Sequence, residues 1–130
     1  MTFPGLLRFL PVGLLLQRWM VAAIFVTSGW SHLTKTEERA KSIGRSKGFT
    51  ILLGSLEVPG GLGVAVGVWP QIAAFVLILV MLGAIYNKIF VWRIGFWGEK
   101  SHGWHYDLML VIMNLVIIFT NGGPYVVTKL

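Results

Sequence analysis

The sequence predicts an all-α membrane protein, an up-down bundle of four transmembrane helices. The first observation is composition, because 55% hydrophobic and 12% charged residues in a 130-residue chain are unusual for a soluble domain. The second is that four apolar stretches are each long enough to cross roughly 30 Å of hydrocarbon at about 1.5 Å per residue. The third is that none of them alternates with the period of two expected of a membrane barrel strand. One domain, 1–130, accounts for the whole chain.

The four helices are predicted at about 10–30, 49–69, 71–92 and 104–121. The longest connection, 31–48, contains Thr36-Glu-Glu-Arg-Ala-Lys, which predicts a short surface helix with Thr36 as its cap. Pro70 stands between the second and third helices, so these two should form a tight antiparallel hairpin. A second loop, 93–103, connects the third helix to the fourth.

Charge in the loops predicts the orientation. Basic residues concentrate around the two long loops: Lys35, Arg39, Lys41, Arg45, Lys47, Lys88, Arg93 and Lys100. The opposite side carries only Arg8 and Lys129. The positive-inside rule therefore places loops 31–48 and 93–103 in the cytoplasm and both termini outside, in a bacterial cytoplasmic (inner) membrane. The net charge of +6 is then explained by orientation and anionic lipid, and does not indicate a nucleic-acid partner.

Each predicted helix contains one charged residue, and these are Arg18, Glu57, Lys88 and Asp107. A charge in hydrocarbon is costly unless it is paired or faces a wet cavity, so we expect all of them in a polar core. Helical periodicity supports this expectation, since it places them on stripes shared with small residues that allow helices to approach closely.

Depth along the helix axes predicts a specific pair. Counted from the predicted helix ends, Arg18 and Glu57 differ by about 6 Å in depth, which is within reach of an arginine side chain. Beside Glu57, Pro59 removes a backbone donor, and with Gly60 and Gly61 it should loosen the second helix. We therefore expect a cavity lined by Arg18, Glu57 and Lys88. The alternative is a dry core in which the ion pair only sets helix register, the glycines only pack, and Lys88 and Asp107 reach the interface.

The sequence points to no covalent cofactor or metal site. With no cysteine it has no disulfide, no thiol redox centre and no cysteine-ligated metal. His32 and His105 lie on the same side of different helices and could in principle hold a haem, but loop-end histidines are usually interfacial. His102 and His105 are three residues apart, with no third ligand in view.

The chain resembles the DoxX family of small four-helix bacterial membrane proteins over nearly its whole length. The matching positions are Arg18, Phe25, Gly29, Glu57, Gly60, Gly61, Gly67, Met81, Ala84, Gly95, Phe96, Trp97, Asp107, Gly122 and Gly123. In one departure, many members carry a histidine late in the third helix, where this chain has Asn87, Lys88 and Ile89. The resemblance implies a four-helix fold and an association with quinone-linked redox complexes.

Three functions remain open. The first is an accessory, non-catalytic subunit of a membrane redox complex that contributes to a quinone or lipid pocket, since the chain shows no standalone catalytic constellation. The second is a small transporter or proton-conducting protein that uses Glu57. The third is a purely structural subunit. Expected partners are membrane lipids and a larger membrane complex or a second copy of the chain.

Overall fold

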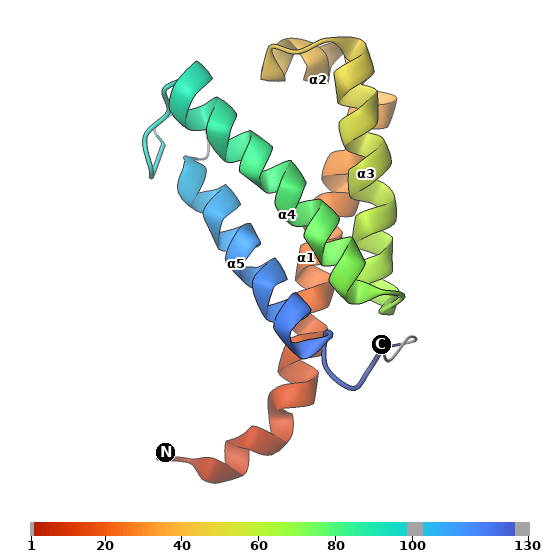
Figure 1. The fold of residues 1–130 in the computed structure, drawn as a ribbon, viewed down its shortest axis with the longest axis vertical. Helices are drawn as coiled ribbons and strands as arrows, with labels where there is room; N and C mark the ends of the chain where they lie inside the picture. Colours follow the sequence, from red (N-terminus) through yellow and green to blue (C-terminus); the bar gives the residue numbers. More distant parts are fainter. Residues whose placement is uncertain (1, 99–102, 127–130) are drawn as a thin grey trace.

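The computed structural model describes residues 2–98 and 103–126, and within them all regular structure is helical (Figure 1). A 3-10 helix, Pro4–Phe9, leads into α1, Leu10–Thr34. The short α2, Thr36–Ile43, precedes α3, Lys47–Val66. Next come α4, Pro70–Tyr86, and a π-helical segment, Asn87–Val91, that prolongs it. The last helix is α5, Trp104–Thr120.

Three helical stretches are apolar and long enough to cross a membrane: Pro4–Thr34, Lys47–Val66 and Pro70–Val91. The fourth, α5, is apolar but shorter, at 17 residues. The predicted helix positions are close to the observed ones, with α1 four residues longer than expected and α3 shifted toward the N-terminus. Gly67 ends α3 with a left-handed φ of 83°, and Pro70 begins α4, so the predicted break between them is confirmed.

The loop between α1 and α3 contains the predicted surface helix, but its start differs from the prediction. Lys35 occupies the N-cap position of α2 and makes no side-chain cap hydrogen bond. The hydroxyl of Thr36 instead donates to the carbonyl of His32 at 2.9 Å, inside the last turn of α1. A threonine hydroxyl can donate to a carbonyl of the preceding turn instead of accepting from an amide of the following one. Thr36 makes the first of these bonds and therefore does not cap α2.

The helices form two pairs, α1 with α3 and α4 with α5, and the pairs meet through α3 and α4. Gly60 of α3 packs against Leu77 of α4 in the half of the hairpin near Pro70. The α4–α5 pair diverges from the α1–α3 pair toward the end of the molecule where α2 lies (Figure 1). The fold is therefore closed at one end and opens at the other.

The register of α1 against α3 is set where their backbones approach most closely. A Cβ on Gly29 would lie 2.9 Å from the Cβ of Glu57, so a larger residue there would force the helices apart. Further along α3, a Cβ on Gly61 would lie 2.8 Å from Cγ2 of Val26 on α1. These contacts place Glu57 opposite Gly29.

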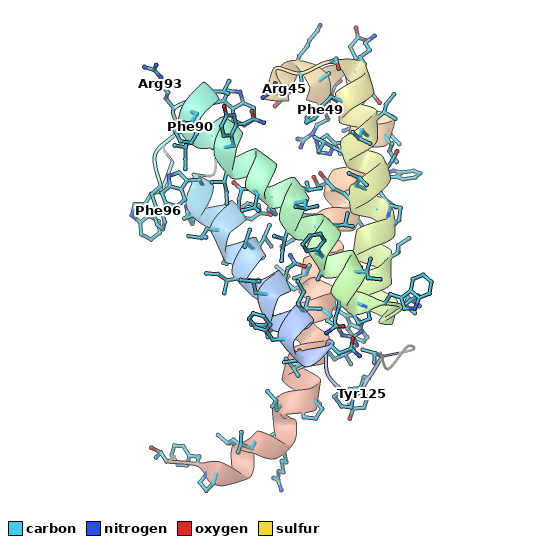
Figure 2. The ribbon with its side chains drawn as sticks, viewed as in Figure 1. Arg45, Phe49, Phe90, Arg93, Phe96 and Tyr125 are labelled. Atoms are coloured by element: carbon cyan, nitrogen blue, oxygen red, sulfur yellow. The ribbon has the colours of Figure 1, made fainter. Side chains whose placement is uncertain are left out.

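Burial confirms the predicted inward-facing stripes of α1 and α3. On α1, Arg18, Ala22, Phe25, Gly29 and His32 are all buried, and on α3 so are Gly54, Glu57, Gly60 and Gly61. Asp107 and Asn114 are the buried polar residues of α5. The apolar core between these stripes includes Phe25, Val64, Leu77, Leu110 and Ile117. Side chains of the outer surface, such as Phe90 in Figure 2, are exposed apolar groups suited to lipid.

Candidate functional site

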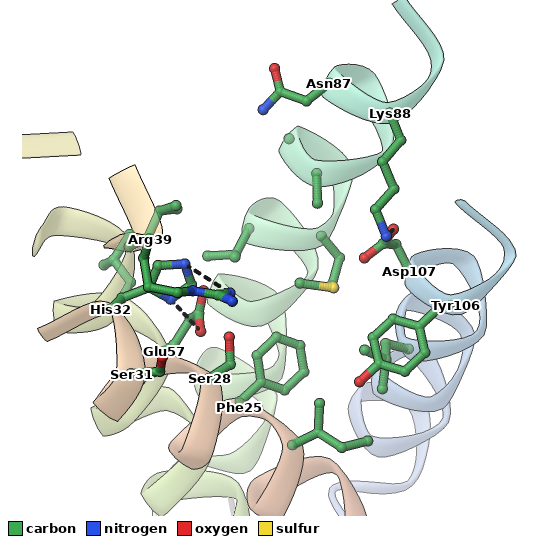
Figure 3. Close-up of a pocket in the computed structure, with 18 of the residues that line it drawn as sticks. Phe25, Ser28, Ser31, His32, Arg39, Glu57, Asn87, Lys88, Tyr106 and Asp107 are labelled. Atoms are coloured by element: carbon green, nitrogen blue, oxygen red, sulfur yellow. Dashed lines mark hydrogen bonds and ion pairs between the residues drawn. The ribbon is translucent and has the colours of Figure 1, made fainter. Parts of the chain in front are cut away.

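A cleft of about 1000 Å³ lies between the two helix pairs, at the end where they diverge (Figure 3). Its apolar lining includes Phe25, Leu53, Met81 and Leu110. Its polar lining comes from α1, α2, α3, the π-helical segment and α5: Thr27, Ser28, Ser31, His32, Arg39, Ser42, Glu57, Asn87, Lys88, Tyr106 and Asp107. A cavity of this size with apolar walls and a few convergent polar groups is the usual form of a small-molecule site.

One wall of the cleft is a chain of three polar side chains from α2, α1 and α3. Arg39 Nη2 lies 3.5 Å from His32 Nε2, and His32 Nδ1 lies 3.6 Å from Glu57 Oε2. His32 and Glu57 are only 4% and 2% exposed, so both polar groups are held away from solvent. Figure 3 draws the two contacts as dashed lines from the imidazole, one to the guanidinium and one to the carboxylate.

The order of these groups determines where the proton of His32 sits. A guanidinium has donors and no acceptor, so the Nε2 atom that faces Arg39 must act as the acceptor. A neutral imidazole then carries its hydrogen on Nδ1, which faces Glu57. Arg39 thus orients an N–H toward the carboxylate from a helix that lies outside the predicted membrane spans.

The opposite wall carries an ion pair. Lys88 Nζ lies 2.8 Å from Asp107 Oδ2, and the two side chains are 13% and 5% exposed. Lys88 also lies 5.8 Å from the centre of the Tyr106 ring. Because the two charges neutralise each other, this wall is polar without a net charge.

The π-helical segment places Asn87 and Lys88 on this wall. Its i to i+5 bonding appears in the hydrogen bond from Trp92 N to Asn87 O, at 2.7 Å. Arg45, beyond the end of α2, donates to Asn87 Oδ1 at 2.5 Å and so connects the two sides of the cleft.

Arg18 lies outside the cleft, and the predicted Arg18–Glu57 pair is wrong. Its side chain is fully buried, with Nη1 donating to Val64 O at 3.1 Å and Nη2 donating to Tyr125 O. Glu57 faces Gly29, eleven residues beyond Arg18, which corresponds to about 16 Å along α1. The estimate from helix ends failed because glycine contacts, and not the limits of the apolar stretches, set the register.

The predicted cavity is therefore present with a different lining. Glu57 and Lys88 line it as expected, and Asp107 joins them, whereas Arg18 does not. The glycines near Glu57 pack against other helices, Gly60 on Leu77 and Gly61 on Val26. α3 continues without interruption through Pro59, so the predicted loosening of this helix is not observed.

Sequence reasoning missed Arg39, Ser28 and Ser31 as cleft residues. Arg39 belongs to α2, a separate helix, and helical periodicity along α1 does not report which way α2 turns. Ser28 and Ser31 carry no signal either, since hydroxyls are common in membrane helices. Their place in the cleft follows from the divergence of the helix pairs.

His105, the other histidine of the described residues, makes its contacts with a different part of the chain. His105 Nδ1 lies 2.7 Å from Phe96 O, and the His105 ring packs near Phe96 and Trp97. Within residues 2–98 and 103–126 no three His, Cys, Asp or Glu side chains come together as metal ligands. Lys100, His102 and Lys129 lie outside the described residues.

The family model of DoxX matches residues 13–92. This span runs from α1 to the π-helical segment and contains Arg18, Glu57 and Lys88. Searches of curated proteins and of solved structures each returned no match to this chain. Since the model covers more than half of a chain built from long apolar helices, the protein is a membrane protein that belongs to the DoxX family.

Proposed function

We propose that this protein is an accessory subunit of a membrane redox complex, and that its cleft receives the headgroup of a quinone or lipid. In this proposal α1, α3, α4 and α5 all span the bacterial cytoplasmic membrane as an up-down bundle. The loops around α2 and after the π-helical segment face the cytoplasm, so the cleft lies in the cytoplasmic half.

The observation that carries the proposal is the combination of apolar walls with buried charged groups in one cleft. Phe25, Leu53 and Met81 offer contacts for an apolar ring or chain. Arg39, Glu57 and Lys88 supply the hydrogen-bonding groups that a polar headgroup needs. Exposed apolar side chains on α3 and α4, such as Leu52 and Leu79, line the same cleft, which suits entry from the lipid.

An accessory role fits the chemistry of these side chains better than an independent enzyme does. The chain has no cysteine, so it cannot supply a thiol or a thiolate-ligated redox centre. Electrons for a quinone would then have to come from a partner that binds the outer surface of the bundle.

Purification from native membranes in mild detergent tests the proposal. We expect an oxidoreductase to co-purify, together with extractable quinone. Replacing Ser28, which lines the cleft, with phenylalanine should remove the quinone and leave the oxidoreductase bound. Purification of the chain alone, with no quinone or single lipid enriched over bulk membrane, would refute the proposal.

The burial of Glu57 favours a second candidate, proton conduction. This carboxylate is 2% exposed, lies two residues before Pro59 and is in contact with a histidine, an arrangement known from proton relays. Proton flux into liposomes that contain the isolated protein, and its loss in Glu57→Gln, would support this candidate over the first.

A further inference from the structure

Three buried polar atoms meet at one place on the cleft wall and have no hydrogen-bond partner among the described residues. They are Oε2 of Glu57 and Nδ1 of His32, which face each other at 3.6 Å, and Nε of Arg39, whose Nη2 lies 3.5 Å from the other ring nitrogen of His32. The contact of 3.6 Å between His32 and Glu57 is longer than a hydrogen bond, so it leaves the bonding capacity of both atoms unfilled. Leaving such groups unpaired away from water is costly.

The chemistry of the three atoms defines what could satisfy them. An ionised carboxylate only accepts hydrogen bonds, so Glu57 needs a donor. A guanidinium only donates, so Arg39 needs an acceptor, and the Nδ1–H of His32 needs one as well. A group that donates one bond and accepts another matches this mixture of one acceptor and two donors, and in a lipid-soluble molecule the simplest such group is a hydroxyl.

We propose that this wall of the cleft recognises a hydroxyl group on an apolar molecule. The hydroxyl hydrogen is donated to Glu57, and the hydroxyl oxygen accepts from Arg39 or His32. This inference rests on the proposed function and narrows it, because a quinone offers only carbonyl acceptors, whereas its reduced form, a hydroquinone, carries hydroxyls. An aliphatic alcohol such as the free hydroxyl of a diacylglycerol shares the same chemistry.

The opposite wall, formed by Lys88 and Asp107, does not distinguish a hydroxyl from a carbonyl group. Lys88 and Asp107 form an ion pair at 2.8 Å, so the charge of this carboxylate is already neutralised by its own cation. Selection for a donor therefore depends on Glu57, and the apolar lining around Phe25 and Leu110 holds the remainder of the molecule.

The main comparison in this test is between a phenol and its methyl ether, in which a methyl group replaces the hydroxyl hydrogen. Binding of 4-nonylphenol, its methyl ether and 1-decanol to the full chain in detergent micelles is measured by calorimetry, with empty micelles as the blank. We expect the phenol to bind about tenfold or more tightly than the ether, since the ether leaves the buried carboxylate unpaired. Decanol that binds like the phenol assigns the hydroxyl to an aliphatic source, and decanol that binds like the ether assigns it to a phenolic one.

Two isosteric variants show whether Glu57 is responsible. A glutamine amide can donate as well as accept, so in Glu57→Gln the phenol should lose most of its advantage over the ether. The matched control is Glu37→Gln, at an exposed residue of α2 that lies 3.9 Å from Lys47 and outside the cleft. It should keep the full preference.

The comparison of phenol and ether binding to the wild-type protein tests the hydroxyl assignment even if Glu57→Gln does not fold. Equal binding of phenol and ether would overturn the hydroxyl assignment and leave the proposed function standing. If none of the three ligands binds and a short-chain quinone does not bind either, the proposed function fails with it. Unchanged preference in folded Glu57→Gln would also overturn the role given to Glu57.

Discussion

Glu57 Oε2 faces His32 Nδ1 at 3.6 Å, and this contact between α3 and α1 defines the polar wall of the cleft. Arg39 contacts the other nitrogen of the same imidazole ring, with its Nη2 3.5 Å from Nε2. The acidic residue in the middle of the apolar segment thus belongs to a site that opens toward α2. Arg18 serves a different purpose at the other end of the same two helices.

Arg18 and Glu57 should contribute to stability independently. Separated by about 16 Å along the helix axis, Arg18→Met and Glu57→Gln should have additive effects within about 0.5 kcal/mol. The measurement is a double-mutant cycle of unfolding free energies in detergent. A coupling energy well above 1 kcal/mol would show that the two side chains interact directly.

Arg18 should act as a clamp on the C-terminal segment. Its guanidinium joins the carbonyl of Val64, at the end of α3, to that of Tyr125, which follows α5. Arg18→Met leaves both carbonyls without this donor, so we expect a loss of about 2 kcal/mol or more in unfolding free energy. Arg8→Met, at an exposed arginine, is the control and should change stability little. An equal effect of the two substitutions would show that Arg18 does not hold the C-terminal segment in place.

Lys88 and Asp107 should be strongly coupled. Lys88→Met leaves a carboxylate buried without its cation, and Asp107→Leu does the reverse. Each single change should therefore cost about 3 kcal/mol, and the double change should cost clearly less than their sum. Thermal unfolding of the four proteins measures this. Additive losses would mean that the pair is not formed in the membrane.

The orientation can be tested with single cysteines because the chain has none of its own. Lys41→Cys places a thiol on α2, and Val68→Cys places one in the turn before α4. In spheroplasts, a membrane-impermeant maleimide should label the protein with Val68→Cys and not the one with Lys41→Cys until the membrane is opened. The reverse pattern would turn the cleft toward the periplasm.

Helical periodicity was enough to predict which residues face inward. Arg18, Glu57 and Asp107 share stripes with small or apolar residues, and all three are buried. The starts of α4 and α5 were also predictable, because Pro70 marks the first and the fourth apolar stretch begins at Trp104.

The partners of these residues could not be predicted in the same way. The axial register of α1 and α3 depends on the close approach of Gly29 to Glu57, and hydrophobicity along the chain does not report such an approach. A cavity was predicted, but its full lining could not be, for a related reason. The cavity arises because α4 and α5 diverge from the other pair, and only tertiary packing determines that angle.

The most direct test for a quinone site between the two helix pairs is photo-crosslinking with an azido-quinone, followed by mass spectrometry of the labelled peptides. In the wild-type protein the label should map to residues that line the cleft, including the Trp92 region, and unlabelled quinone should compete with it. Ser28→Phe fills the cleft and should abolish this labelling, while Ser55→Phe, on an exposed face of α3, should leave it intact. Labelling spread over the outer surfaces, or equal labelling of both variants, would contradict a ligand site between the two helix pairs.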